Sequence, residues 1–265
     1  MASKRKPLTK IEGFHFDEVA HVYTLDGKPL HGVTSVLSII SKPALIGWAS
    51  NTNTEYIKEH ANKEYVDDKF TYYQVSEGVL EEARTAHTKK KEKAGELGSD
   101  VHSLIEALVK GVIGAGGGIV DPDTKSDNPQ VQLFIDWARD NQVKFIESEK
   151  RVYSKESWYA GTLDLVLEMK GEKYIADIKT SSAIYPEAYL QMAAYQGAME
   201  EMNEHTDIKG AMVINLPKKG GFEIGMNYAY DDNRVAFLAA LVLYKQLNAI
   251  GGPQKEIKTK KVINI

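Results

Sequence analysis

The chain has 265 residues, of which 43% are hydrophobic and 26% are charged, a balance typical of a globular protein with one large or two small cores. No run approaches the roughly 18 apolar residues of a membrane span, and the basic N-terminus lacks the apolar stretch of a secretory signal. The absence of cysteine excludes disulfides, thiolate zinc sites and iron–sulfur clusters held by cysteine. We therefore expect a cytoplasmic protein with no membrane partner.

The formal net charge of −4 argues against a globally basic nucleic-acid binder, but the basic residues are unevenly placed. They gather in residues 1–10, 84–93 and 253–265. Such segments can contact phosphates locally, and they are equally well explained as solvated surface.

The first elements predicted along the chain are a hairpin and two helices. Alternating residues on both sides of Asp26-Gly27 predict a β-hairpin. Thr34 or Ser35 is the expected N-cap of a short helix, and a second helix is expected behind Pro43. Residues 51–95 are polar and charged, which favours further helices on the periphery.

The middle of the chain combines an amphipathic helix with a glycine-rich segment. Apolar residues at helical spacing predict a helix over 97–111, which Gly111 would end. The glycine-rich residues 111–130 are expected to form a loop. No strand precedes this loop and no Gly-Lys-Ser/Thr follows it, so it does not have the pattern of a phosphate-binding P-loop.

From residue 129 onward, helix-like and strand-like patterns alternate. The predicted helices are 129–142, 184–204 and 232–248. The predicted strands are 144–153, 158–168, 173–179 and 209–216, followed by a Lys-Lys-Gly-Gly turn and another strand. The order from residue 97 predicts an α/β (α+β) fold with a central mixed sheet flanked by helices.

Charged residues interrupt the hairpin predicted around Lys170-Gly171. A turn that is symmetric about this dipeptide places Asp164 opposite Asp177, and Lys179 on the same face as Asp177. The opposite face would be apolar and would pack on a helix. It consists of Leu163, Leu165, Leu167, Tyr174, Ala176 and Ile178.

This arrangement of charges suggests a metal site. Carboxylates on directly opposite residues repel each other, and a divalent cation between them removes the repulsion. Oxygen ligands favour Mg²⁺ or Mn²⁺, and the ammonium of Lys179 could orient a water beside the cation. The alternative is that the three charges lie on a solvated face of the sheet.

Four stretches carry a resemblance to a known family. They are GSDVHSLIE at 98–106, AGTLDLV at 160–166, ADIKTSS at 176–182 and YLQMAAY at 189–195. In these residues the chain resembles the PD-(D/E)XK nuclease superfamily, in its RecB-like exonuclease branch. The N-terminal HVYTLDGKPLHGVTSVLS at 21–38, with KPALIGWAS at 42–50, resembles the phage-type exonucleases of this branch and their mitochondrial genome-maintenance relative.

The resemblance implies a set of site residues. Asp164, Asp177 and Lys179 would be catalytic, and His102, Asp164, Asp177 and the backbone carbonyl of Ile178 would bind Mg²⁺ or Mn²⁺. Members that carry an iron–sulfur cluster use four cysteines, which this chain lacks.

Several nearby residues are auxiliary candidates. Glu106 lies one helical turn after His102 and either touches the site or is an ordinary surface carboxylate. Either Glu147 or Glu149, on a strand entering the sheet, could bind the metal or orient Lys179.

The helix after the hairpin supplies further candidates. Gln191 and Tyr195 match the family's Gln-x-x-x-Tyr motif. The glutamine is expected at the catalytic centre, whereas the tyrosine could be functional or part of the core. Thr180 and Ser181 could contact phosphate or cap the helix.

The resemblance also implies a fold and a domain division. The family core has the order α-β-β-β-α-β, as in restriction endonucleases. Residues 97–265 would form this core together with a C-terminal helix and a basic tail. Residues 1–96 would form a hairpin and helical region that packs on the core and clamps DNA.

The function implied is that of a metal-dependent deoxyribonuclease. We expect an exonuclease that hydrolyses phosphodiester bonds from DNA ends, on single strands or duplex ends, in recombination, replication or repair in a bacterial or phage-infected host cell. A single-strand annealing or binding protein would be a natural partner. The alternatives are a structure-specific endonuclease on the same core and a catalytically silent DNA-binding recombination partner.

Overall fold

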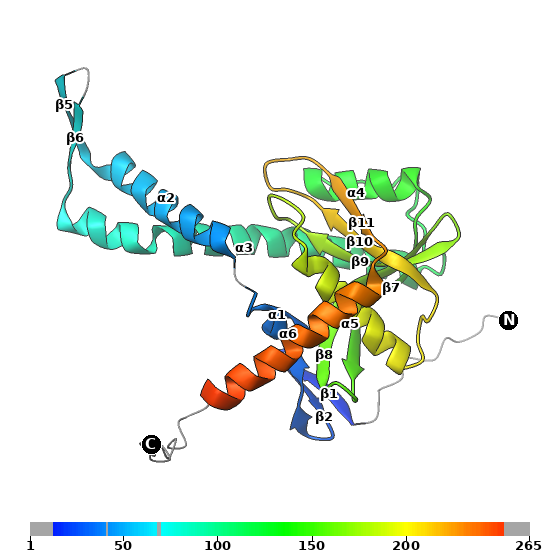
Figure 1. Ribbon diagram of the computed structural model, residues 1–265. Helices are drawn as coiled ribbons and strands as arrows, with labels where there is room; N and C mark the ends of the chain where they lie inside the picture. Colours follow the sequence, from blue (N-terminus) through cyan, green and yellow to red (C-terminus); the bar gives the residue numbers. More distant parts are fainter. Residues whose placement is uncertain (1–12, 41, 68–69, 252–265) are drawn as a thin grey trace, which may run out of the picture.

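A computed structural model describes residues 13–40, 42–67 and 70–251 of the protein. The basic segments 1–10 and 253–265 lie outside the described residues. Figure 1 shows a body built around a β-sheet, from which a long arm of two helices and a hairpin projects.

The body is organised by a six-stranded sheet in the order β11-β10-β9-β8-β4, with β7 also paired to β8. The β9–β10 and β4–β8 pairs are parallel and the others are antiparallel, so the predicted mixed sheet is confirmed. The strands are β4 (His31–Gly32), β7 (Lys144–Ser154), β8 (Tyr159–Met169), β9 (Glu172–Lys179), β10 (Ile208–Asn215) and β11 (Glu223–Asn227).

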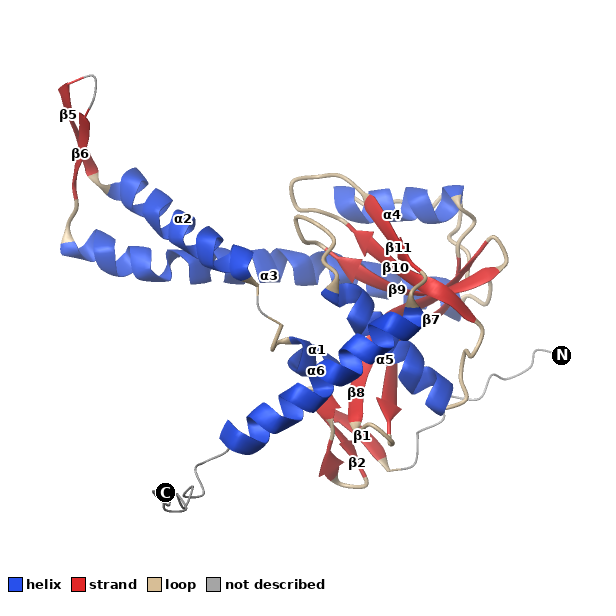
Figure 2. Ribbon diagram, in the orientation of Figure 1, coloured by secondary structure: helices blue, strands red, loops and turns tan. Residues whose placement is uncertain are grey.

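Helices cover both faces of this sheet, as Figure 2 shows. On one face α1 (Val33–Leu37), α5 (Glu187–Glu201) and α6 (Tyr230–Gly251) build a core around Met192 and Phe237. On the other face α3 (Glu77–Gly114) and α4 (Pro129–Asp140) build a second core around Ile105 and Phe134. Because both faces are apolar, strands such as β9 are buried almost throughout.

The N-terminal strands form the predicted hairpin. They are β1 (Phe14–Asp17), β2 (Val22–Leu25) and β3 (Lys28–Pro29). Asp26 and Gly27 both have left-handed backbone, with φ of 50° and 74°, as a two-residue type I′ turn requires. The predicted cap of the next helix is wrong: the chain pairs with β8 up to Gly32, so α1 starts directly after it and Gly32 is the N-cap.

The arm contains an element that the sequence patterns did not indicate. Between α2 (Pro43–His60) and α3 lie two antiparallel strands, β5 (Asn62–Asp67) and β6 (Phe70–Gln74), where only helices were expected. The aromatic and β-branched residues of 70–74, FTYYQ, favour a strand, whereas the polar and charged composition of residues 51–95 as a whole predicted helices.

Helix α3 joins the arm to the body. It runs without a break through the predicted domain boundary at 96/97 and past Gly111, the predicted end, to Gly114. In the arm, α2 packs against it at two small buried residues, Ala83 and Ala86. None of the helices within the described ranges is both long and apolar enough to cross a membrane.

A prediction concerns the contact between β8 and α5. A Cβ added at Gly161 would lie 2.3 Å from Cε1 of the buried Tyr195 ring. We expect Gly161→Ala to lower the free energy of unfolding by about 1–3 kcal/mol, because the ring must shift from its position against β8 to make room for the Cβ. Gly47→Ala in α2 is the matched control, since a Cβ there meets nothing within 4 Å. Denaturant unfolding of both variants tests this, and equal stabilities would contradict it.

Candidate metal centre

The charged hairpin folds in the predicted register. Lys170 and Gly171 both have positive φ, 55° and 80°, and form a two-residue turn of type I′. The pairs run from Met169↔Glu172 to Leu165↔Ala176, each with the predicted symmetry about the turn. The regular ladder ends there, one step before Asp164 and Asp177.

The β8–β9 ladder ends where the regular alternation of side chains between the two faces of the sheet breaks, on both β7 and β8. Leu163 and Val166 in β8 pack in the same core although they are three residues apart. Their partners in β7, Lys150 and Glu147, form an ion pair with each other at 3.1 Å. In a regular strand, residues three apart point to opposite faces. The prediction that Leu163 shares a face with Leu165 is therefore wrong.

This break in alternation places two acids, Glu149 on β7 and Asp164 on β8, side by side. Ser148 pairs with Leu165 and Lys150 with Leu163, so Glu149 falls beside Asp164. Glu149 has a left-handed backbone with φ of 51°, which is uncommon for a residue with a side chain. Such strained positions are often found at functional sites.

Asp164 makes two close contacts with its Oδ2 atom. His102 Nε2, from α3, lies 2.9 Å away, and the backbone N–H of Ile178 donates a hydrogen bond to it at 2.7 Å. The carboxylate of Asp164 is therefore already partly compensated. The expected direct opposition of two bare carboxylates, Asp164 and Asp177, does not describe the arrangement.

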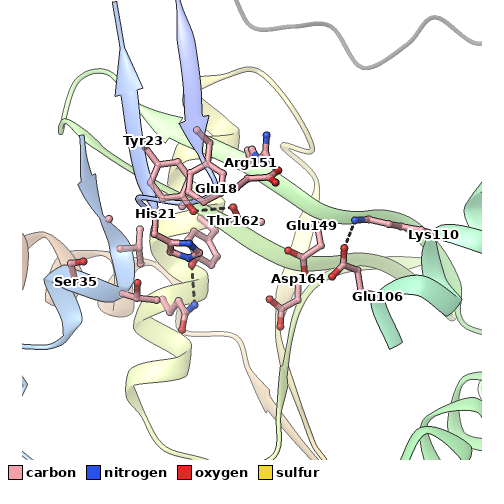
Figure 3. A pocket seen from close by; sticks show the side chains of 17 residues that line it. Glu18, His21, Tyr23, Ser35, Glu106, Lys110, Glu149, Arg151, Thr162 and Asp164 are labelled. Atoms are coloured by element: carbon pink, nitrogen blue, oxygen red, sulfur yellow. Dashed lines mark hydrogen bonds and ion pairs between the residues drawn. The ribbon is translucent and has the colours of Figure 1, made fainter. Parts of the chain in front are cut away.

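His102, Glu149 and Asp164 form a triad of possible metal ligands. One ligand atom from each lies within 4.8 Å of the others. Figure 3 shows Glu149 and Asp164 side by side, with Glu106 and Lys110 of α3 close by. The three ligands come from a helix and two paired strands, elements that the packing of the body holds in fixed positions.

Asp177 and Lys179 lie next to the triad on β9. Asp177 is 2% exposed, and its Oδ2 atom lies 2.6 Å from Lys179 Nζ. The approach lacks hydrogen-bond geometry, so this buried oxygen accepts no hydrogen bond from any residue within the described ranges. An oxygen of this kind is suited to a further positive or hydrogen-bonding partner.

The environment shifts the pKa values of two members of the triad, His102 and Glu149, upward. The hydrogen bond to Asp164 raises the pKa of His102 to about 9, against the opposing effect of burial. Burial and the charge of Asp164 raise the pKa of Glu149 to about 7. Without a cation, His102 and Glu149 therefore retain their protons to a higher pH than usual.

The same applies to the neighbouring pair. Burial raises the pKa of Asp177 to about 6, although Lys179 opposes the shift. Burial alone would lower the pKa of Lys179, but the charges of Asp177 and Asp164 more than offset this and raise it. Lys179 is therefore a stable ammonium.

These features fit a divalent cation. Two carboxylates and one imidazole are a donor set found at sites for first-row divalent ions, and the carboxylates also suit Mg²⁺. A cation would replace the protons that the raised pKa values retain on this acid-rich site. Glu149 completes the triad in place of Asp177, which lies deeper and faces Lys179.

A cavity of about 520 Å³ opens beside the triad. Asp164, Glu149 and Glu106 line one wall, and Thr162, Gln191 and Tyr195 are also among its lining residues. The remaining wall is formed by the N-terminal hairpin and the start of α1, which include Phe16, His21, Tyr23 and Ser35. Sequence patterns did not indicate this contribution, because the hairpin reaches the site only through tertiary packing.

The other predicted residues are distributed as follows. Gln191 Nε2 donates to the hydroxyl of Tyr195 at 2.9 Å, and the Tyr195 ring is buried against Gly161, so this tyrosine belongs to the core and also lines the cavity. Thr180 lies against Gly98 of α3. Ser181 donates to the carbonyl of Ala183 and so orders the turn before α5, but it does not cap that helix.

The three glutamates that the sequence left as candidates, Glu106, Glu147 and Glu149, occupy different positions in the structure. Glu106 pairs with Lys110 at the rim of the cavity. Glu147 is turned away: it contacts His205 and Lys150, each at 3.1 Å. Of the two glutamates in β7, Glu149 is thus the one at the site. The sequence could not distinguish them, because regular alternation would put both on one face.

The chain matches no protein-family model and no curated protein sequence. A solved structure titled "Crystal structure of SSO0001" is similar over 81% of this chain and 82% of that chain, with 11% sequence identity and a TM-score of 0.35. A similarity at this level supports no argument about the fold or the function of this chain.

Proposed function

We propose that the protein is a Mg²⁺- or Mn²⁺-dependent deoxyribonuclease that hydrolyses phosphodiester bonds at DNA ends. The observation that carries the proposal is the convergence of His102, Glu149 and Asp164 beside a buried Asp177–Lys179 pair. Structural ion pairs alone do not need three acids and a histidine gathered in one place, whereas metal-dependent phosphodiester hydrolysis uses a cation site of this kind, and an adjacent ammonium can offset the developing negative charge.

The order of elements also supports a PD-(D/E)XK core. From α3 the chain continues through β7, β8, β9, α5 and β10, with α4 inserted after α3. This is the α-β-β-β-α-β order expected for that family, with its acids on the second and third strands. We propose that family for the chain on this basis.

In this proposal each residue has a distinct role. His102, Glu149 and Asp164 would hold the cation, which would supply Lewis-acid chemistry, offsetting negative charge on the phosphate oxygens and making water a better nucleophile. The N–H of Ile178 holds the Asp164 carboxylate in place, and His102 Nε2, which contacts Asp164 without a cation, would exchange this contact for the cation. The Ile178 carbonyl is an additional candidate ligand.

Lys179 acts next to the reacting phosphate. Its ammonium is held by Asp177, stays charged because its pKa is raised, and is about one-third exposed. It can therefore donate a hydrogen bond to the attacking water and to a phosphate oxygen as negative charge develops. Asp177 fixes the position of the ammonium from below.

The cavity provides space for the nucleotide. Its volume lies within the roughly 300–1,000 Å³ typical of small-molecule sites, so it can hold one nucleotide rather than a long duplex. The hairpin walls the cavity on the side away from α3. A one-nucleotide pocket with a closed side favours a chain end as substrate, which is why we propose an exonuclease rather than an endonuclease.

The first prediction from the proposed function concerns the ligand Asp164. We expect Asp164→Asn to reduce Mg²⁺-dependent cleavage by at least about 100-fold. The amide oxygen can still accept the Ile178 hydrogen bond, so the loss reflects charge rather than shape. Cleavage of an end-labelled oligonucleotide measures this.

The matched control is Asp207→Asn, which removes the charge of an exposed acid paired with Lys173 at the opposite end of β9. It should retain full activity. Undiminished cleavage by Asp164→Asn would rule out the proposed centre.

The second prediction concerns Lys179 and the substrate. Lys179→Met should slow cleavage by about 10²–10³-fold, with little change in the concentration of Mn²⁺ needed, because the ammonium is not a ligand. Wild-type protein should degrade linear single- and double-stranded DNA and leave closed circles intact. Cleavage of circles would favour the endonuclease, and DNA binding without cleavage would favour the silent DNA-binding protein.

The third prediction concerns pH. Without a cation, the raised pKa of His102 contributes stability that is present below pH 6.5 and lost as the pH rises through about 9. The raised pKa values of Glu149 and Asp177 mean that ionising these groups costs stability above their ordinary pKa values, in full by about pH 7 and 6. All three effects make the metal-free protein less stable as the pH rises.

A bound cation needs the same groups deprotonated, so its stabilising effect should grow with pH. We expect the increase in melting temperature caused by Mn²⁺, relative to EDTA, to be larger at pH 8 than at pH 6. It should be lost in Asp164→Asn. An increase that is equal at both pH values, or that persists in the variant, would place the cation elsewhere.

A further inference from the structure

The face of α3 that presents His102 to the metal centre continues along the arm. Residues 4, 7, 11, 14 and 18 positions before His102 return to nearly the same side of an α-helix. They are Gly98, Gly95, Lys91, Thr88 and Arg84, which we call the α3 stripe. Arg84, Thr88, Lys91 and Gly95 are exposed and Gly98 is partly buried.

The packing of α2 leaves this stripe open. The residues of α3 that contact α2 are others: His87 contacts Asn53, Lys90 pairs with Glu55, and Glu82 accepts a hydrogen bond from Tyr56. The buried residues of this half of α3, Ala83 and Ala86, also lie outside the stripe.

The acids Glu96 and Asp100 lie well to the side of the stripe, at least 120° from His102 around the helix. Two acids are nearer: Glu81 and Glu92 lie about 60° and 80° from His102 around the helix, and Glu81 pairs with Arg84 at 2.9 Å. The stripe itself consists of cationic, small and hydroxyl residues, and the Glu81–Arg84 ion pair borders its outer end.

A second element borders the stripe where it reaches the site. A Cβ added at Gly98 would lie 2.6 Å from the Thr180 hydroxyl and 3.7 Å from Lys218 Nζ. Thr180 directly follows Lys179, and the exposed Lys218 comes from the loop after β10. The missing side chain at Gly98 thus lets a hydroxyl and an ammonium lie over α3 between the arm and the metal centre.

We infer that the α3 stripe, with Thr180 and Lys218, is a track for the phosphodiester backbone of single-stranded DNA. Its cations, Arg84, Lys91 and Lys218, are complementary to phosphates, and a phosphate at Arg84 would compete with Glu81 for its guanidinium. Gly95 allows the strand to approach the helix backbone, and Gly98 makes room for Thr180 and Lys218. The 18 residues from Arg84 to His102 span about 27 Å, enough for several nucleotides. The cations form a single row, which matches one backbone rather than the two of a duplex.

This inference extends the proposed function by naming the path of the strand, and it rests on that proposal for the strand's destination. It concerns binding and can be tested without cleavage. Fluorescence anisotropy of labelled oligothymidylates in EDTA gives the affinity of the full chain as a function of oligonucleotide length and salt concentration. Affinity should rise with length until the track is filled.

The decisive comparison is between two double variants with the same change in charge. Arg84→Glu with Lys91→Glu reverses two charges on the stripe, whereas Lys89→Glu with Lys93→Glu reverses two exposed charges on other faces of the same helix. The first should weaken binding roughly 10- to 30-fold at 0.1 M salt and reduce the salt slope by about 1.4, since each phosphate contact contributes about 0.7. The second should bind like wild type.

A glycine pair provides an independent test. A Cβ meets nothing within 4 Å at either Gly95 or Gly111, and Gly111 lies on the side of α3 opposite His102. Gly95→Glu should therefore fold but bind long oligonucleotides several-fold more weakly, and Gly111→Glu should bind normally. Equal weakening by both double variants, or by both glycine variants, would show attraction by the diffuse charge of the arm and overturn the track.

The two proposals fail in different ways. Stripe-specific loss of binding in a protein that cleaves no DNA would support the track and reject the nuclease. Cleavage that depends on Asp164, with no difference between the paired variants, would support the nuclease and reject the track.

Discussion

The structure of the site depends on placing acids close together in a region that is largely withdrawn from water. Asp164, Glu149 and Asp177 lie near one another, and each would be unstable there without compensation. The chain supplies that compensation from several directions: the ring of His102, the Ile178 amide and the Lys179 ammonium. This compensation is incomplete, because the pKa values of Glu149 and Asp177 remain raised. Additional positive charge, such as that of a cation, would be most favourable beside these two groups.

The surrounding elements follow from the need to hold these groups in position. The break in alternation on β7 and β8 turns Glu149 and Asp164 out of the two cores and toward α3. Helix α3 must then pass close to the sheet at this point, and it buries Val101 and Ile105 on either side of His102 to do so. The tight packing of Tyr195 on Gly161 fixes α5, and with it Gln191, against the other side of β8.

Much of the core of this arrangement could be predicted from the sequence, because it depends on local rules. The Lys170-Gly171 turn determines its own register, so the neighbourhood of Asp164 and Asp177 followed from counting. The choice of Glu149 over Glu147 could not be predicted, since it depends on a left-handed residue inside a strand. The contribution of the hairpin to the cavity and the length of α3 were also inaccessible, because they arise from contacts between segments distant in the sequence.

The continuity of α3 has a consequence for cooperativity. Its second half buries Val101, Ile105 and Val109 in a core, whereas its first half buries only small residues, Ala83 and Ala86, against α2. Gly95 and Gly98, two poor helix formers, lie between the halves. We expect amide hydrogens in the arm to exchange through local opening at low free-energy cost, while those near His102 exchange only when the body unfolds. The two halves of this continuous helix would then open independently, each with its own free energy of opening. The arm would be able to change conformation without moving Asp164 and Glu149, which lie beside the second half of α3.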